Sequence, residues 1–295
     1  MNNTTYNDFS EFIPDVKFEL IQIKDLTSNQ EYQRNISMKH VERAAKAFDP
    51  YQINPVKVSR RNGINYVFNG QHTIEIVAKV SKSRETPVWC MVYEDLDYMM
   101  EADIFANQLK YTKSLLPYEI FMANVEAGND KELFIKSIVE AYNLKISLNK
   151  TIGGICAVAA LETIYEDYGY EVLDRTIRMI VATWEGAVDS LSANMLKGVA
   201  LILTTYENYF NEEIFKDKLG RVSIKALSRT AKERGNGTLG YSEAMVLEYN
   251  KKMKVGALHL SKLNTERNKN RKDKQKENEQ LFSLLDSINS NEQNI

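Results

Sequence analysis

Cysteine and proline are both scarce in this chain, with 2 and 5 copies among 295 residues. Cys90 and Cys156 each lie inside an apolar stretch, which favours buried reduced thiols over a disulfide. No apolar run reaches the roughly 18 residues of a membrane-spanning helix, and the first residues lack the basic-then-apolar order of a signal peptide. These absences predict a non-secreted, cytoplasmic protein with no membrane partner.

The chain also lacks a sizeable net charge, because 38 lysines and arginines against 40 aspartates and glutamates leave −2. Such balance produces little long-range field at a phosphate backbone, so any DNA contact has to be local. Positive charge gathers at 221–234 and 251–276, and each stretch is either a phosphate-contact surface or only a solvated one. The DNA-contact candidates in the second stretch are Lys251, Lys252, Lys254, Arg267, Lys269, Arg271 and Lys272.

The N-terminal part of the chain alternates between strand and helix patterns. Four short β-type runs predict strands, at 18–23, 55–58, 66–68 and 87–93. Helical spacing predicts one helix over 38–48, with Ser37 as its N-cap, and another directly after Gly70. The Asn62-Gly63 pair between the second and third strands is the strongest local signal for a hairpin. This order predicts a small mixed domain over 1–112.

Helix patterns dominate from position 96 onward. Apolar stripes at 135–142 and 173–184 predict amphipathic helices, and the uniformly apolar segment 152–165 predicts a central helix surrounded by others. The expected fold class is therefore α+β, with an all-helical domain over 113–260 after the mixed domain. The last stretch, 261–295, is charged and is expected to be a disordered tail or a solvated helix.

The junction Asn69-Gly70-Gln71-His72-Thr73 carries the most suggestive chemistry. A glycine between a strand and a helix aims the free N–H groups of the helix outward, which is the physical basis of an anion or phosphate cradle. Gln71 adds an amide, His72 a ring that titrates near neutral pH, and Thr73 a hydroxyl. The alternative is that Thr73 is only an N-cap and His72 only a satisfied loop residue.

Several short motifs occur in a characteristic order: Glu31-Tyr32-Gln33-Arg34, the helix over 38–48, Asn54-Pro55-Val56-Lys57-Val58, the hairpin, the Gly70 junction, Thr86-Pro87-Val88 and Ala102-Asp103-Ile104-Phe105-Ala106-Asn107. Together they resemble the ParB/sulfiredoxin-like superfamily over about 18–127. The helical remainder resembles ParB-like proteins of bacterial plasmids, prophages and other mobile elements.

The resemblance implies two activities that the residues can be compared with. Sulfiredoxins use the cysteine of a Gly-Cys-His-Arg loop, and Gln71 stands in its place, so no sulfiredoxin activity is expected. Partition proteins bind cytidine triphosphate through a Gly-Glu-Arg-Arg loop, and a later Glu-Asn pair helps with magnesium and hydrolysis. Here the loop lacks both arginines, and Ala106-Asn107 lacks the glutamate. Binding of a CTP-like triphosphate with Mg²⁺, rather than its turnover, is the implied chemistry.

The resulting ligand-binding candidates are Gln33, Arg34, Asn69, Gly70, Gln71, His72, Thr73 and Asn107. Arg34 could supply one of the missing cations and Asn107 a polar ligand group, and both could equally be surface residues. No residue is assigned as catalytic or as a metal ligand.

A helix-turn-helix is the other expectation that the resemblance carries. The best candidate joins a helix over 131–143 through the turn 144–147 to a helix that begins near Thr151. That second helix begins with almost no side chains able to reach bases or phosphates, so it is not expected to read a DNA sequence.

Three hypotheses follow. The first is a nucleotide- or phosphate-responsive, DNA-associated protein of a mobile element. The second is a ParB-like nuclease or nucleotide hydrolase, for which Glu75 beside the loop is the one nearby carboxylate. The third is an inhibitor or adaptor of a host protein complex, with a vestigial ligand pocket. The sequence has no heptad seam that predicts an oligomeric state.

Overall fold

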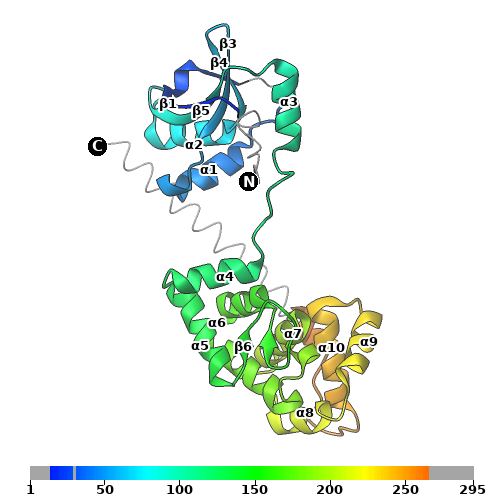
Figure 1. Ribbon diagram of the computed structural model, residues 1–295. Helices are drawn as coiled ribbons and strands as arrows, with labels where there is room; N and C mark the ends of the chain where they lie inside the picture. Colours follow the sequence, from blue (N-terminus) through cyan, green and yellow to red (C-terminus); the bar gives the residue numbers. More distant parts are fainter. Residues whose placement is uncertain (1–13, 29–30, 266–295) are drawn as a thin grey trace, which may run out of the picture. The chain divides into compact units, whose positions relative to one another are not determined.

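The structure, a computed structural model, describes residues 14–28 and 31–265 and divides into two compact units, Met1–Ser114 and Leu115–Ile295 (Figure 1). The first unit combines strands and helices, and the second is helical apart from one short pair of strands. The expected α+β class is confirmed.

The N-terminal unit is built on a five-stranded mixed sheet in the order β1-β5-β3-β4-β2. Its strands are β1 (Val16–Gln22), β2 (Leu26–Ser28), β3 (Val56–Arg61), β4 (Ile64–Asn69) and β5 (Pro87–Tyr93). Its helices are α1 (Met38–Lys46), α2 (Gln71–Ser81) and α3 (Tyr98–Asn107), with 3-10 turns η2 (Ile23–Asp25) and η3 (Pro50–Gln52). β1 pairs antiparallel with β5, and β4 pairs antiparallel with β3. The pairs β3–β5 and β2–β4 are parallel.

The predicted β3–β4 hairpin is confirmed. Asn62 and Gly63 form its two-residue turn with φ of 53° and 78°. Two consecutive positive φ values match the twist of the flanking strands, which explains the preference for an Asn-Gly pair.

One face of the sheet packs against α2. Val56, Val58, Val67, Val88 and Cys90 point from β3, β4 and β5 into a buried cluster that α2 completes with Ile74. Both cysteines are free, as expected, although Cys156 is only half-buried. Burial raises the pKa of the Cys90 thiol to about 11, so it is an unreactive core group.

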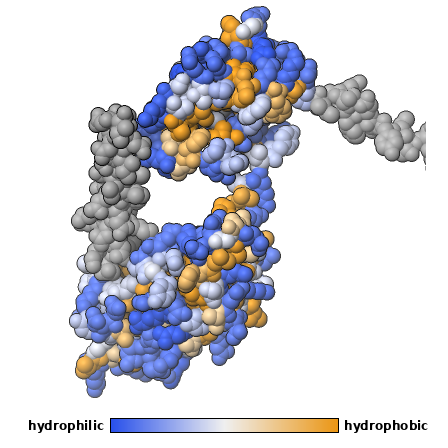
Figure 2. Space-filling model, turned by 90° about the vertical axis from the view of Figure 1, so that its left-hand side faces the viewer, coloured by the Kyte–Doolittle hydropathy of each residue, from blue (hydrophilic) through white to orange (hydrophobic). Residues whose placement is uncertain are grey.

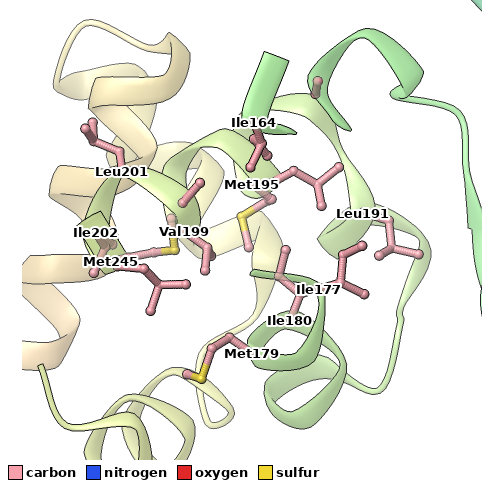
Figure 3. Close-up of a cluster of buried hydrophobic side chains, with 14 of the residues drawn as sticks. Ile164, Ile177, Met179, Ile180, Leu191, Met195, Val199, Leu201, Ile202 and Met245 are labelled. Atoms are coloured by element: carbon pink, nitrogen blue, oxygen red, sulfur yellow. The ribbon is translucent and has the colours of Figure 1, made fainter. Parts of the chain in front are cut away.

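Seven α-helices of the C-terminal unit lie wholly within the described residues. They are α4 (Pro117–Glu126), α5 (Asp130–Ala141), α6 (Val158–Trp184), α7 (Ala193–Thr205), α8 (Glu212–Leu219), α9 (Ile224–Glu233) and α10 (Gly237–Asn250). A 3-10 turn, η4 (Val188–Leu191), precedes α7, and β6 (Lys145–Ile146) pairs with β7 (Gly154–Ile155). Figure 3 shows the core, where Ile177 and Ile180 of α6 face Met195 and Val199 of α7. The two predicted stripes fall on α5 and α6, and most of their apolar residues are buried.

Two sequence predictions are wrong in this unit. The central helix expected over 152–165 begins only at Val158, and Ile152 is 84% exposed. The chain turns at Gly153, whose φ is +69°, so that β7 can pair with β6. No helix begins near Thr151, and the predicted helix-turn-helix is therefore absent. The helix that does form runs to Trp184 and is kinked at Gly169 (φ 81°).

Within 14–28 and 31–265, no helix is long and apolar enough to cross a membrane. The charged tail was predicted to begin at 261, but residues 261–265 are helical and Leu263 is fully buried in the core, so this boundary is wrong. The rest of the predicted tail, 266–295, lies outside the described residues.

Candidate functional site

Gly70 forms the turn from β4 into α2, as the sequence predicted. Its φ of +106° is a conformation that favours glycine, and a Cβ atom there would lie 3.1 Å from the Cα of buried Val56. The Ile74 N–H donates to the Gly70 carbonyl at 3.0 Å, and no side chain caps this end of α2. The N–H groups of the first turn, from Gln71 to Thr73, therefore have no acceptor within the helix.

His72 connects the beginning of α2 to the beginning of α1. Its Nε2 accepts a hydrogen bond from the Ser37 N–H at 3.1 Å, and Ser37 Oγ in turn accepts from the His40 N–H at 3.4 Å. The His40 and His72 rings meet edge to face, with centroids 5.4 Å apart. Two helix N-termini, each a partial positive charge, thus come together at one imidazole.

The local electrostatics at His72 favour an anion. Burial, the Arg34 guanidinium and His40 all lower the His72 pKa below its usual value, in that order of effect. Neither α1 nor α2 has an acidic residue in its first turn, where helices commonly carry one. The positive end of each helix is therefore left without an anionic side chain of its own.

The lowered His72 pKa predicts a pH-dependent contribution to stability. The unfolded state binds a proton at a higher pH than the folded state, so this contribution is present above pH about 6.5 and is lost as pH falls below it. We expect wild type to lose more stability between pH 7.5 and 5.5 than His72→Gln, whose amide oxygen can still accept from Ser37. Urea denaturation at each pH measures the difference, and parallel pH curves would contradict it.

Two buried glutamines position the segment before α1. Gln71 is 6% exposed and its Nε2 donates to the Arg34 carbonyl at 2.8 Å. Gln33 is 8% exposed and its Nε2 donates to the Val67 carbonyl at 2.5 Å. Gln33 Oε1 has no hydrogen-bond partner among the described residues. The two amide side chains hold the backbone of this segment in place through their hydrogen bonds. The Arg34 side chain remains exposed beside His72.

Two of the remaining ligand candidates, Asn69 and Asn107, form hydrogen bonds to α3 or to the residue that follows it. Asn69 Nδ2 donates to Gln108 Oε1 at 2.7 Å, and Asn107 Nδ2 donates to the Asp103 carbonyl and Oδ1 at 3.0 Å. Asn107 is thus bonded within α3. Thr73 is half-buried in the first turn and is not the N-cap, because Gly70 occupies that position.

Sequence reasoning missed a buried ion pair that holds α3 against the hairpin. Glu101 is fully buried, and its Oε1 lies 2.7 Å from Arg61 Nε. The Nε–Oε1 contact is ionic rather than a well-aligned hydrogen bond, whereas Arg61 Nη2 donates to Glu101 Oε2 at 3.4 Å and the Tyr32 hydroxyl donates to the same oxygen at 3.1 Å. Burial and the Glu101 charge both raise the Tyr32 pKa. A glutamate in an otherwise acidic stretch gave no signal that it would be buried.

The basic stretch 221–234 forms a charged helix face. Leu227 and Ala231 of α9 are buried, whereas three exposed cations follow one stripe at positions i, i+4 and i+7: Lys225, Arg229 and Lys232. None of these three has an ion pair within the described part of the chain, although the exposed Glu233 lies on the same helix. Arg221 and Arg234 at the two ends are paired with Asp217 and Glu243.

The other DNA-contact candidates follow α10. Lys251 is paired with Glu248 at 2.6 Å, and Lys252 and Lys254 are exposed. Four candidates lie outside the described residues: Arg267, Lys269, Arg271 and Lys272.

A nuclease or hydrolase would need a free carboxylate near the Gly70 turn. Glu75 is paired with Arg84 at 2.6 Å. Among the described residues, no group of three or more histidine, cysteine, aspartate or glutamate side chains could hold a metal ion.

One similar solved structure is the crystal structure of the C-terminally truncated chromosome-partitioning protein ParB from Caulobacter crescentus, complexed with CTP-gamma-S. It is 14% identical with a TM-score of 0.35, and the match covers 63% of this chain and 99% of that one. No curated protein matches the chain. The model of a family of unknown function, DUF6551, matches residues 27–262, and the chain therefore belongs to this family.

Proposed function

We propose that the N-terminal unit is a ParB/sulfiredoxin-like module that binds a phosphate group of a nucleotide-like ligand at the start of α2. The observation that carries this proposal is the meeting of two helix N-termini at His72, with no acidic residue in the first turn of either helix. Such ends bind anions through free N–H groups and the helix dipole.

Each residue has a definite role in this proposal. Gly70 lets the backbone approach the anion, and the N–H groups of Gln71, His72 and Thr73 donate to it. Arg34 supplies a charge-assisted hydrogen bond from its exposed guanidinium, and Gln33 and Gln71 position that segment. A CTP-like triphosphate with Mg²⁺ is the finer proposal. Binding rather than turnover is proposed, because Glu75 is already engaged by Arg84.

Thermal shift and calorimetric titration with a nucleotide panel, with and without Mg²⁺, test this proposal. A ligand that binds only the native state raises the melting temperature. Arg34→Ala should weaken binding roughly 10- to 100-fold, the effect of losing one charge-assisted hydrogen bond. Arg43→Ala removes an exposed cation from the far end of α1 and should leave the affinity unchanged. No response to any nucleotide or to pyrophosphate would contradict the proposal and favour an adaptor or inhibitor.

A second observation supports association with DNA through α9. Lys225, Arg229 and Lys232 have no ion pair among the described residues, and they lie on the face of α9 opposite the buried face that packs against α10. An α-helix fits the major groove of B-form DNA, and cations along it displace condensed counterions. Mobile-element origin stays a prediction of the sequence resemblance.

DNA affinity as a function of salt measures this association. The triple variant Lys225→Ala, Arg229→Ala, Lys232→Ala should bind more weakly, with a logarithmic salt slope shallower by about 3 if each cation contacts one phosphate. The control removes the same number of positive charges elsewhere in the unit, at Lys136, which is paired with Glu140, and at the exposed Lys145 and Lys150. Equal losses in both variants would mean that α9 has no special role. A chain ending at Thr265 measures the tail separately and keeps Leu263, which is buried in the core.

A further inference from the structure

The outer edge of β1 is an unpaired strand with an apolar face. β1 is the terminal strand of the sheet and pairs along its whole length with β5 alone among the described strands. Phe18 is 61% exposed and Leu20 is 56% exposed on the face opposite α2. Trp89, directly opposite Leu20 on β5, is 56% exposed. Figure 2 shows apolar side chains gathered on a side of this unit.

Such an edge is rarely left open in a native protein. Natural edge strands are short, carry inward-pointing charge or proline, or are covered, because their free N–H and C=O groups pair readily with another strand. β1 has seven residues and contains no proline, and its two inward-pointing charges, Lys17 and Glu19, are of opposite sign, so a second strand can pair with them instead of being repelled. The apolar side therefore has no protection of its own.

We propose that β1 pairs antiparallel with β1 of a second copy of this chain, so that two sheets join into one across a two-fold axis. The axis passes through Phe18, which lies opposite Phe18 of the other copy. In this register Val16 of each copy lies opposite Leu20 of the other on the apolar face. Lys17 of each copy lies opposite Glu19 of the other on the α2 face.

Charge selects this register over its neighbours. A two-fold axis perpendicular to the sheet keeps the apolar side chains of both copies on one face. Such an axis places one residue of β1 directly opposite the same residue of the other copy, and the strand offers few such positions. An axis through Lys17 or through Glu19 places like charges directly opposite each other, which is destabilising. An axis through Leu20 sets Glu19 against the aliphatic Ile21. Only the axis through Phe18 makes two opposite-charge pairs.

The charged face is already prepared for such a pairing. Lys17 Nζ lies 2.9 Å from Glu94 Oε2, and Arg60 Nη2 lies 2.6 Å from Glu19 Oε2 within one copy. Pairing through Phe18 would join these into a continuous alternation of charge across the axis, from Glu94 and Lys17 of one copy to Glu19 and Arg60 of the other. Several charges joined in one network contribute more reliably to stability than isolated surface pairs do.

The oligomeric state of the full chain tests the proposal. Sedimentation across a concentration series should show a monomer–dimer equilibrium for wild type. Phe18→Lys places two lysines opposite each other and should raise the dimer dissociation constant about tenfold or more. Met99→Lys, at a 76% exposed position on α3, should leave it unchanged. Circular dichroism confirms that both variants are folded. A wild-type monomer at every concentration, or equal effects of the two variants, would overturn the proposal.

Disulfide trapping tests the register. Under mild oxidation Phe18→Cys should yield a covalent dimer, because the two Cα atoms would lie about 5 Å apart, within disulfide reach. Leu20→Cys should not, because its two copies would be separated by four residues along the strands, roughly 14 Å. Efficient trapping of Leu20→Cys, or none of Phe18→Cys, would overturn the register.

Discussion

Replacing Glu101 with alanine is expected to lower the free energy of unfolding of the N-terminal unit by about 3 kcal/mol. Removing one partner of a fully buried ion pair costs about 3–5 kcal/mol, and the lower end applies here because the Arg61 side chain is 28% exposed. Arg61 Nε is buried and depends on Glu101, and the Tyr32 hydroxyl would lose its acceptor as well.

An exposed ion pair of the same unit provides the control. Glu85 lies 3.3 Å from Lys24, with side-chain exposures of 75% and 47%. Exposed pairs contribute about 0–1 kcal/mol, so Glu85→Ala should cost little. Urea denaturation of both variants measures the difference. If Glu101→Ala cost no more than Glu85→Ala, α3 would not depend on this pair for its place on the sheet.

Replacing Gly70 with alanine is expected to cost about 3 kcal/mol. A left-handed backbone costs a non-glycine residue about 1–2 kcal/mol, and forcing a methyl group against a packed core costs about 1–3 kcal/mol more. The added Cβ would lie 3.1 Å from Val56 Cα and 3.2 Å from its Cγ2, and Val56 is fully buried.

Gly63 separates the two contributions. It also has a positive φ, +78°, but a Cβ there would meet nothing within 4 Å. Gly63→Ala should therefore cost only the backbone strain, about 1–2 kcal/mol. Equal urea midpoints for the two variants would mean that the approach of Gly70 to Val56 relaxes without cost.

The local features of the N-terminal unit were predictable because each has a short-range cause. Ser37 was expected to cap α1, and its Oγ does accept from the His40 N–H. Asn62-Gly63 requires two positive φ values, and Gly70 stands where a strand pattern changes to a helical one. In all three cases the conformation depends on residues that are neighbours in the sequence, so the sequence alone was enough to predict it.

The features that were missed depend on contacts distant in sequence. Gln71 carries no pattern that predicts its bond to the Arg34 carbonyl, and Glu101 meets Arg61 only once α3 has packed on the hairpin. The segment 152–157 has the composition of a buried helix. Its pairing with β6 overrides that local preference, because the Gly153 turn makes a strand pairing available.

The most direct test of the phosphate-binding proposal is to titrate the isotope-labelled full chain with pyrophosphate and then CTP, while following its backbone amide resonances. The proposal predicts the largest shifts at the N–H groups of Gln71, His72 and Thr73, with smaller ones at Ser37. Resonances of α7, a mostly buried helix of the C-terminal unit, serve as the internal reference. Shifts that are absent at the start of α2, or that are centred on another surface, would contradict a phosphate site there.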